Sequence, residues 1–377
     1  MSWDDCTLGD VVTLKRGHDL PNAKRVAGTV PVVSSSGFTG LHNEAKAKPP
    51  GVVTGRYGTI GEVFYVTEPF WPLNTALYAI DFHGNDPRFV SYFLRNQLKD
   101  YQSNKAAVPG VDRNVLHKFP VRCTDSQTQK RIVSVLSAYD DLIENNRRRI
   151  GLLEEAARLL FREWFIHFRF PGHEQVKIID GVPEGWKQHT FGCLFDFSGG
   201  FAFKSSTYTD DGRFSVVTIK NVHDAEFVPE CPSRVDEIPQ KMKTRCRLST
   251  GDILLSLTGN VGRACVVFGE NYLLNQRVAK VVGKEGISDQ FAYWTFSNSD
   301  TQKQLENLAY GVAQLNLSPV KLSERPFVRP SQHLMDDFTD ITEPIFEQLI
   351  KINLYTQELT KARDLLLSCL MDGRLEI

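Results

Sequence analysis

Basic and amide side chains recur in the glycine-flanked loops of this 377-residue sequence. In a DNA major groove, arginine pairs with guanine edges, asparagine and glutamine pair with adenine edges, and lysine and serine more often hold phosphates. Each such residue taken alone is more often solvated surface than a contact. The candidate DNA contacts that this chemistry selects are Lys15, Arg16, Ser35, Arg56, Tyr57, Asn74, Arg113 and Asn114 in the first half of the chain, and Lys204, Lys220, Asn221, Asn260, Arg263, Gln276, Arg277, Gln314 and Asn316 in the second.

The sequence lacks the patterns of common catalytic sites. Residues 199–205 approach a phosphate-binding Gly-x-x-x-x-Gly-Lys-Ser/Thr loop but have Lys204 in place of the second glycine. There is no Asn-Pro-Pro-Tyr segment for adenine methylation, and the nine histidines are dispersed. Residues 195–200 faintly resemble a methyl-donor loop, but their counterparts, residues 12–17, do not. We therefore expect a binding protein with no catalytic residue, no metal site and no cofactor of its own.

Composition sets broad limits on the protein. A length of 377 residues suits two domains plus connecting helices, and a hydrophobic content of 41% supports real cores. The net charge of -1 argues against a chain coated in positive charge, although local basic patches would suffice for nucleic acid. Seven scattered cysteines without a Cys-x-x-Cys indicate free thiols in a reducing cytoplasm. The acidic N-terminus is not a signal peptide, and no apolar run is long enough for a membrane span.

The chain contains an internal repeat, which bears on every other motif. Slowly growing offsets between matching positions are what loop insertions in the second copy would produce. At an offset of 183, Trp3, Thr7, Gly9 and Gly17 fall on Trp186, Thr190, Gly192 and Gly200. At 201, Gly58 and Gly61 fall on Gly259 and Gly262, and Leu73-Asn74 falls on Leu274-Asn275; Asn114 resembles Asn316, and at 207 Asn146 falls on Asn353.

Each copy begins with a mostly β segment. Short apolar runs bounded by glycine predict strands at residues 51–54, 62–66, 252–256 and 264–268. Amphipathic patterns predict short helices at residues 86–97 and 288–296. We call the β-rich segments the first head (residues 1–123) and the second head (residues 186–330). The connecting loop at residues 171–185 is rich in proline and glycine, with Trp186 expected to anchor the second core.

Each head is followed by a long heptad pattern that predicts a helix, at residues 124–170 and 331–377. Two such helices in one chain most simply pair with each other, although packing of each helix on its own head is the alternative. Asn146 and Asn353 lie at or beside the seams, where a polar residue can fix register. Thr356 and Arg363 weaken the second seam, and Pro344 predicts a bend or a start after it. The pairing residues are Ile132, Leu136, Tyr139, Ile143, Ile150, Leu153, Leu160, Leu349, Ile352, Leu359 and Leu366.

The order of these motifs, present twice, resembles the specificity subunit of type I restriction–modification systems. The resemblance rests on the Trp-initiated start of each copy, the Gly-x-x-Gly loop, the following Leu-Asn, and the Gly-Val-Pro-Glu-Gly-Trp segment ending at Trp186. It also rests on the stretch of the first long helix that runs from Gln129-Lys-Arg-Ile to Asn146. No single motif is specific, but together they cover essentially the whole chain.

The resemblance implies an α+β fold in which two mostly β target recognition domains are separated by a pair of long antiparallel coiled-coil helices, with a pseudo-twofold repeat. It implies that each head reads one half of a split double-stranded DNA site and that the helices set the gap. It also implies partners: two adenine methyltransferase subunits that use S-adenosylmethionine, and possibly a motor-nuclease subunit that uses ATP and Mg. In that family the subunit is not catalytic.

Two other classes of function stay open at this point. A coiled-coil scaffold that joins two proteins without reading DNA is favoured slightly by the modest net charge. A nuclease or methyltransferase acting by itself is disfavoured because the catalytic motifs are missing.

Overall fold

The computed structural model describes residues 3–56, 61–99, 111–311 and 315–377. The chain forms two compact units, Met1–Ile143 with Leu359–Ile377, and Glu144–Glu358. Both long helices therefore contribute to both units, and each unit combines one head with a segment of each helix. The domain boundaries expected from the sequence stay a prediction, because the compact units divide the helices instead of separating them from the heads.

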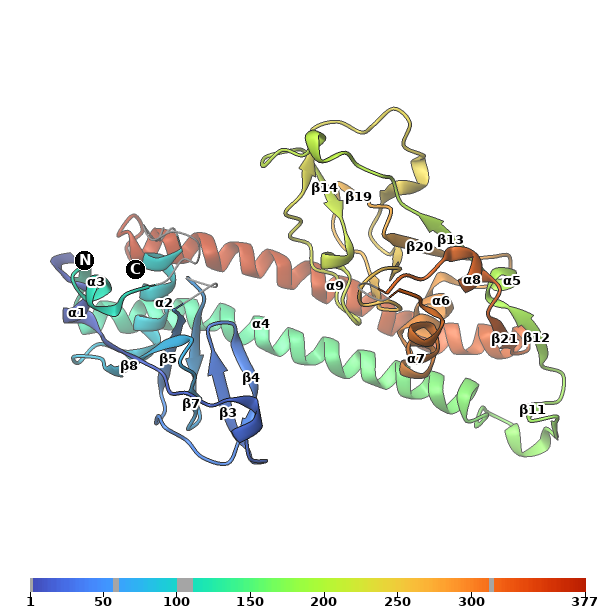
Figure 1. Ribbon diagram of the computed structural model, residues 1–377, viewed down its shortest axis with the longest axis horizontal. Helices are drawn as coiled ribbons and strands as arrows, with labels where there is room; N and C mark the ends of the chain where they lie inside the picture. Colours follow the sequence, from blue (N-terminus) through green and yellow to red (C-terminus); the bar gives the residue numbers. More distant parts are fainter. Residues whose placement is uncertain (1–2, 57–60, 100–110, 312–314) are drawn as a thin grey trace. The chain divides into compact units, whose positions relative to one another are not determined.

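The first unit holds two sheets and a two-stranded ribbon (Figure 1). One sheet has the order β2-β8-β5-β6, the other has the order β4-β3-β7 with a parallel β3–β7 pair, and β1 pairs with β9. The predicted strands at residues 51–54 and 62–66 are confirmed as β5 and β6. The strands are β1 (Trp3–Thr7), β2 (Thr13–Arg16), β3 (Val30–Ser34), β4 (Gly37–His42), β5 (Gly51–Gly55), β6 (Val63–Val66), β7 (Trp71–Pro72), β8 (Ala76–Asp81) and β9 (Pro120–Thr124).

The helix α2 (Pro87–Leu98) joins the first head to the long helices. Its N-terminus is capped by Asp86, whose carboxylate accepts hydrogen bonds from the backbone N–H groups of Arg88 and Phe89. Phe89 and Phe93 are fully buried in a core that also contains side chains of both long helices. The remaining helical segments of this head are η1 (Asn22–Lys24), α1 (Leu8–Val11) and α3 (Arg113–His117).

The second unit repeats this plan with insertions. Its sheet β13-β20-β17-β18 corresponds to β2-β8-β5-β6, and the parallel pair β14–β19 corresponds to β3–β7. The predicted strands at residues 252–256 and 264–268 are confirmed as β17 and β18. The strands are β10 (Ile178–Ile179), β11 (Val182–Pro183), β12 (Lys187–Thr190), β13 (Phe195–Gly199), β14 (Phe214–Val217), β15 (Arg234–Val235), β16 (Arg247–Leu248), β17 (Ile253–Ser256), β18 (Ala264–Val266), β19 (Tyr272–Leu274), β20 (Val278–Gly283) and β21 (Pro326–Arg329).

Aromatic residues fill the core of the second unit. Phe338 of the last long helix lies 5.7 Å from Phe161 and 6.2 Å from Phe291, measured between ring centroids. Trp186 is buried and stacks on Phe170, which confirms its expected role as an anchor. The helical segments are η3 (His173–Gln175), α5 (Phe191–Leu194), η4 (Ser205–Thr207), η5 (Ile219–Asn221), η6 (Thr244–Cys246), α6 (Asp289–Ser297), α7 (Ser299–Leu308) and α8 (Pro319–Ser323).

The two long helices are α4 (Ser126–Phe161), continued by the wider π-helical turn η2 (Arg162–Ile166), and α9 (Gln332–Met371). The expectation that the second helix begins after Pro344 is wrong, because α9 starts twelve residues earlier and includes this proline. Pro344 and Asp340 are both exposed, so the carbonyl that loses its helical partner faces solvent.

The heptad residues pack both on the heads and on the opposite helix, so neither of the two expected arrangements excludes the other. Beyond Leu153 the buried stripe of α4 moves to Glu154, Ala157 and Phe161, as a 3.6-residue helix drifts from a 3.5-residue repeat. Of the predicted pairing residues, Ile132, Leu136, Ile143, Leu349 and Ile352 are buried, and Tyr139, Ile150, Leu153, Leu160, Leu359 and Leu366 are half-buried.

Polar residues in the seam find polar partners. In the second unit the Asn146 amide donates to the Thr356 hydroxyl at 3.1 Å, across the two helices. This contact supports the register role expected of Asn146. The Asn353 amide instead donates to the Leu349 carbonyl of its own helix at 2.8 Å, so this hydrogen bond does not link the helices.

Glu154 on α4 has a buried carboxyl group in the second unit, and the residue is 6% exposed. The Tyr293 hydroxyl of α6 donates to it at 2.5 Å, and Arg158 lies 3.6 Å away. Burial raises the pKa of Glu154 from 4.5 to about 7. The folded chain therefore holds this proton more tightly than the unfolded chain does.

Glu154→Gln is expected to change how stability depends on pH. Because the folded-state pKa is raised, the wild type loses stability as pH rises from about 4.5 to about 7, by on the order of 3 kcal/mol, and then levels off. The variant lacks this loss and gains relative to wild type over that window. Thermal melting from pH 5 to 8 measures the difference. The exposed neighbour change Glu155→Gln is the control, and parallel curves for Glu154→Gln and wild type would contradict the assignment.

Candidate nucleic-acid interface

In the first head, one short segment ties together the ends of three strands. This segment, Leu73 to Thr75, is called the first bridging turn. The Leu73 N–H donates to the Val33 carbonyl at 2.8 Å, and the Asn74 N–H donates to the His18 carbonyl at 3.0 Å. The Arg56 N–H donates to the Thr75 carbonyl at 3.0 Å. The C-terminal ends of β2, β3 and β5 are thereby held around one turn.

The second head contains the same arrangement around Asn275 to Arg277, the second bridging turn. The Asn275 N–H donates to the Val217 carbonyl at 3.0 Å, and the Gln276 N–H donates to the Phe201 carbonyl at 3.1 Å. The Leu257 N–H donates to the Arg277 carbonyl at 3.1 Å. These bonds repeat those of the first bridging turn one for one, so the duplication extends to the backbone of the candidate surface.

The hydrogen bonds correct the alignment of the two copies. Leu73 bridges to His18 as Asn275 bridges to Phe201, so the offset at this turn is 202. Asn74 therefore corresponds to Gln276, and the expected match of Asn74 to Asn275 is wrong by one residue. The sequence comparison aligned Leu73-Asn74 with Leu274-Asn275 because the two pairs are identical. The backbone hydrogen bonds show that the true alignment is shifted by one residue.

The expected match of Asn114 to Asn316 is also wrong. The Val111 N–H donates to the Arg56 carbonyl at 2.9 Å, and the Leu317 N–H donates to the Leu257 carbonyl at 2.8 Å. Val111 therefore corresponds to Leu317, at an offset of 206. Asn316 precedes that point, whereas Asn114 follows it.

A glycine packs against each bridging turn. A Cβ atom at Gly17 would overlap the Leu73 carbonyl, and one at Gly200 would overlap the Leu274 carbonyl. Glycine is needed at both positions because the backbones approach so closely. The shape of the turn is therefore enough to explain the sequence match at these two positions.

Most of the first head's candidates lie on the segments joined by the first bridging turn. Arg16 ends β2, Ser35 follows β3, Arg56 follows β5, and Asn74 is in the turn itself. The Ser35 N–H donates to the Thr75 hydroxyl at 3.4 Å. The exposed candidates of this head are Lys15, Arg16, Arg113 and Asn114, and the half-buried ones are Ser35, Arg56 and Asn74.

Asp19 is a member of this surface that the sequence did not single out. Its carboxylate lies 3.9 Å from the Arg16 guanidinium and accepts a hydrogen bond from the Asn74 amide. It therefore orients two of the predicted contact residues. Asp19 lies three residues beyond the end of β2, and its role becomes visible only from the geometry of the turn.

The second head gathers its candidates in the same way. Asn260 and Arg263 lie on the β17–β18 loop, and the Gly259 N–H of that loop donates to the Leu315 carbonyl at 2.9 Å. The Thr258 hydroxyl donates to the Asn316 side-chain oxygen at 3.1 Å. Gln276 and Arg277 are exposed in the turn.

Lys204 and Lys220 are exposed on neighbouring loops of the second head. Lys204 lies three residues beyond Phe201, and Lys220 lies two residues beyond Thr218. They border the segments joined by the second bridging turn and are suited to holding phosphates.

Asn221 does not lie on the candidate surface. Asn221 is 1% exposed, its oxygen accepts from Thr218, and its amide donates to the carbonyls of Val228 and Glu230 at 2.9 and 3.1 Å. Its side chain shapes a loop, so the expectation that it contacts DNA is corrected. Tyr57 and Gln314 lie outside the described residues.

The surfaces of both heads offer hydrogen-bond donors and positive charge. Across the described ranges, no group of three or more histidine, cysteine, aspartate or glutamate side chains could hold a metal ion. In the same part of the chain, no helix is both long and apolar enough to cross a membrane. Two loop clusters carry an amide group at equivalent places, Asn74 and Gln276, with an arginine nearby in each head, and this suits recognition of a polyanion that displays base edges.

Comparisons with known proteins identify the family. Residues 1–155 and 183–332 match the model of the type I restriction modification DNA specificity domain. The chain is 22% identical to the type I restriction enzyme HindI specificity subunit of Haemophilus influenzae, over 97% of this chain and 93% of that protein. It is 24% identical to the MjaIX specificity subunit of Methanocaldococcus jannaschii, over 77% of this chain and 68% of that protein.

A solved structure shows the same fold. The S subunit of a type I restriction–modification system from M. genitalium aligns over 98% of this chain and 96% of its own, with a TM-score of 0.58 at 17% identity. The two domain matches cover most of the sequence, one on the first head with most of α4 and the other on the second head. The chain therefore belongs to the family of type I restriction–modification specificity subunits and carries their DNA specificity domain in two copies.

Proposed function

We propose that each head reads one half of a bipartite double-stranded DNA site. The duplicated bridging turn is the observation that carries this proposal. It presents an amide side chain at the same place in both heads, Asn74 in the first and Gln276 in the second, next to Arg56 and Arg277. Amide and guanidinium groups are those that distinguish adenine and guanine edges. Surrounding lysines would hold phosphates.

The helices α4 and α9 set the distance between the half-sites in this proposal. Each helix contributes to the core of both units, and Asn146 with Thr356 favours one register. A helix pair of fixed length would fix the length of DNA between the half-sites, because half-sites on one face of B-DNA repeat about every 34–36 Å.

The chain performs no catalysis in this proposal and acts within a cytoplasmic complex. Two adenine methyltransferase subunits dock on the helices and supply S-adenosylmethionine chemistry, and a motor-nuclease subunit would add ATP- and Mg-dependent cleavage. The duplicated architecture supports two equivalent docking sites.

A coiled-coil scaffold that joins two proteins without reading DNA is the second candidate, favoured by the net charge of -1. Salt dependence separates the two. The affinity of the purified chain, with its methyltransferase partners, for duplex DNA should fall steeply as salt rises, since each phosphate contact releases counterions and contributes a slope of about -0.9. Absence of any duplex binding at low salt would favour the scaffold.

Arg277→Ala and Arg56→Ala are each expected to relax only their own half of the site. Loss of a bidentate base contact costs about 1–3 kcal/mol and lowers discrimination at that position. Competition binding with duplexes mutated in one half-site at a time measures this. Arg329→Ala and Arg122→Ala, on the β21 and β9 strands away from the turns, are the controls and should leave both halves unchanged. Equal weakening at both halves would show that the arginines hold phosphates or the fold.

Lengthening the helix pair is expected to lengthen the spacer between the half-sites. Seven residues are inserted after Ile143 in α4 and seven after Glu358 in α9, at the boundaries of the compact units. The insertion adds roughly 10 Å of helix, close to three base-pair steps. Selection from DNA with random spacers should return the same half-sites with a longer gap. Altered half-sites with an unaltered gap would contradict the assignment of the helices.

A further inference from the structure

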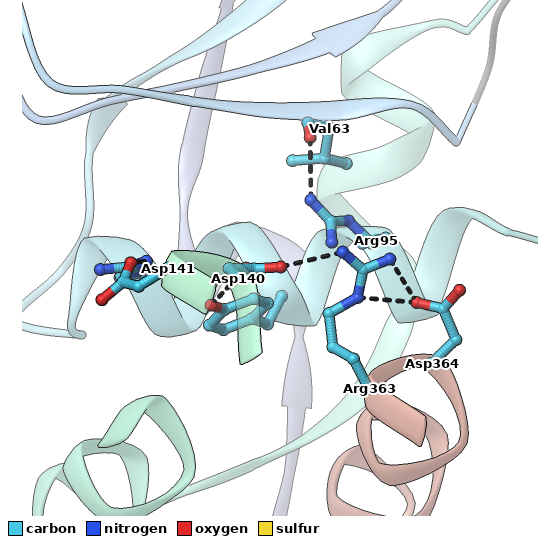
Figure 2. Close-up of polar contacts among 8 residues, drawn as sticks. Val63, Arg95, Asp140, Asp141, Arg363 and Asp364 are labelled. Atoms are coloured by element: carbon cyan, nitrogen blue, oxygen red, sulfur yellow. Dashed lines mark hydrogen bonds and ion pairs between the residues drawn. The ribbon is translucent and has the colours of Figure 1, made fainter. Parts of the chain in front are cut away.

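Asp140 of α4 bonds two other elements at once, and both lie in the first unit. Its Oδ2 accepts a hydrogen bond from the Tyr92 hydroxyl of α2 at 2.6 Å. Its Oδ1 accepts from the Arg363 guanidinium of α9 at 2.9 Å, as Figure 2 shows. One carboxylate therefore joins the helix of the head to both long helices.

The Tyr92 hydroxyl is built to donate. Tyr92 is 1% exposed, and burial beside Asp140 raises the pKa of its hydroxyl well above the ordinary value. The hydroxyl therefore keeps its proton throughout the physiological range. A buried hydroxyl that lost this acceptor would be left unsatisfied, which makes the position of Asp140 relative to the head well defined.

Further contacts carry the connection into the sheet of the head. One turn before Tyr92, the Arg88 guanidinium donates to Asp141 of α4 at 2.7 Å. One turn after it, Arg95 lies 5.9 Å from the Tyr92 ring centroid and donates to the Val63 carbonyl of β6 at 3.4 Å (Figure 2). Polar contacts thus run from the sheet through α2 to α4.

Arg363 occupies a position where the heptad pattern calls for an apolar residue. Its side chain is 16% exposed and that of Asp140 is 25% exposed. The remaining guanidinium nitrogens of Arg363 donate to Asp364 at 2.9 and 2.6 Å (Figure 2). Arg363 is therefore fully engaged, and its charge is neutralised from two directions.

A half-buried ion pair contributes little net stability compared with apolar residues of the same size, because desolvation offsets attraction. Its effect is to select one arrangement. Leucines slide past one another at modest cost, whereas a shift of the head or of α9 would leave Asp140 or Arg363 without its partner. The network is thus better suited to fixing an angle than to adding stability.

We propose that Asp140 is a positioning residue that holds the first head at one angle on α4 and α9, so that the protein accepts one spacer length. This inference rests on the proposed reading of a gapped DNA site. It assigns a specificity role to residues that do not lie on the candidate recognition surface.

Three substitutions weaken the network in different ways. Asp140→Asn keeps an acceptor for Tyr92 but removes the charge opposite Arg363. Arg363→Met keeps a long side chain in the seam without the ion pair, and Tyr92→Phe removes only one hydroxyl. Each variant should let the head adopt neighbouring angles while the bridging turn stays intact.

The test uses the full chain in complex with its methyltransferase subunits. Binding is measured on duplexes that carry both half-sites at the natural spacer, and at spacers one base pair shorter and longer. We expect the preference for the natural spacer to fall by roughly tenfold, the value of one hydrogen bond to a charged group. Discrimination within each half-site should stay at the wild-type value. A variant that is merely destabilised would bind all three duplexes less well in the same proportion.

Asp252→Asn is the matched control. Asp252 pairs with Lys280 at 2.7 Å inside the second head, with side chains 14% and 20% exposed, and belongs to the compact unit that does not contain the Asp140 network. It should leave the spacer preference unchanged. Folding is checked by thermal melting, and Tyr92→Phe with Arg363→Met decides the question if Asp140→Asn does not fold. Unchanged spacer preference in the folded variants would overturn the inference alone. A wild type that distinguishes neither half-sites nor spacers would overturn the proposed function itself.

Discussion

Each head completes its apolar core with side chains from both long helices. In the first unit, Phe89 of α2 shares a buried cluster with Ile132 of α4 and Leu370 of α9. In the second unit, Phe161 and Phe338 play the same part. Removing one such side chain from its contacts costs about 1.5–3 kcal/mol, so a head cannot leave its helix segments without unfolding part of its core. Each head is therefore held on its own segments of α4 and α9.

The candidate recognition surfaces are built differently from the cores. At each bridging turn the strand ends are joined through backbone hydrogen bonds, which do not depend on side-chain identity. Side chains such as Arg277 can therefore vary without loss of the turn, and loops on a rigid scaffold are where binding specificity is usually found. Gly17 and Gly200 cannot be replaced in this way, because a Cβ atom at either position would overlap the backbone next to the turn.

The sequence predicted the repeat, the main strands and both helices, because these depend on local periodicity that recurs in each copy. It left open whether the second helix bends at Pro344 or starts after it, since the outcome depended on which side of the helix faced solvent. It placed Asn221 on the DNA surface, whereas the fold buries that side chain under three hydrogen-bonded neighbours. An amide side chain can form the same hydrogen bonds within a loop as with the edge of a base. Only its burial in the structure distinguishes the two roles.

The polar residues of the second seam show a similar limit. Thr356 and Arg363 look like interruptions in a heptad pattern, yet each faces a polar side chain of α4, Asn146 or Asp140. A pattern read along one helix cannot reveal a complement on another. Polar residues that weaken a coiled-coil seam can therefore specify how its helices pair.

A map of methylated adenines in cells with this gene intact and deleted tests most directly whether the two heads read half-sites at a fixed separation. Deletion should remove methylation at one motif made of two short half-sites separated by a gap of fixed length. Loss of a single uninterrupted motif, or of half-sites at variable separation, would contradict this expectation.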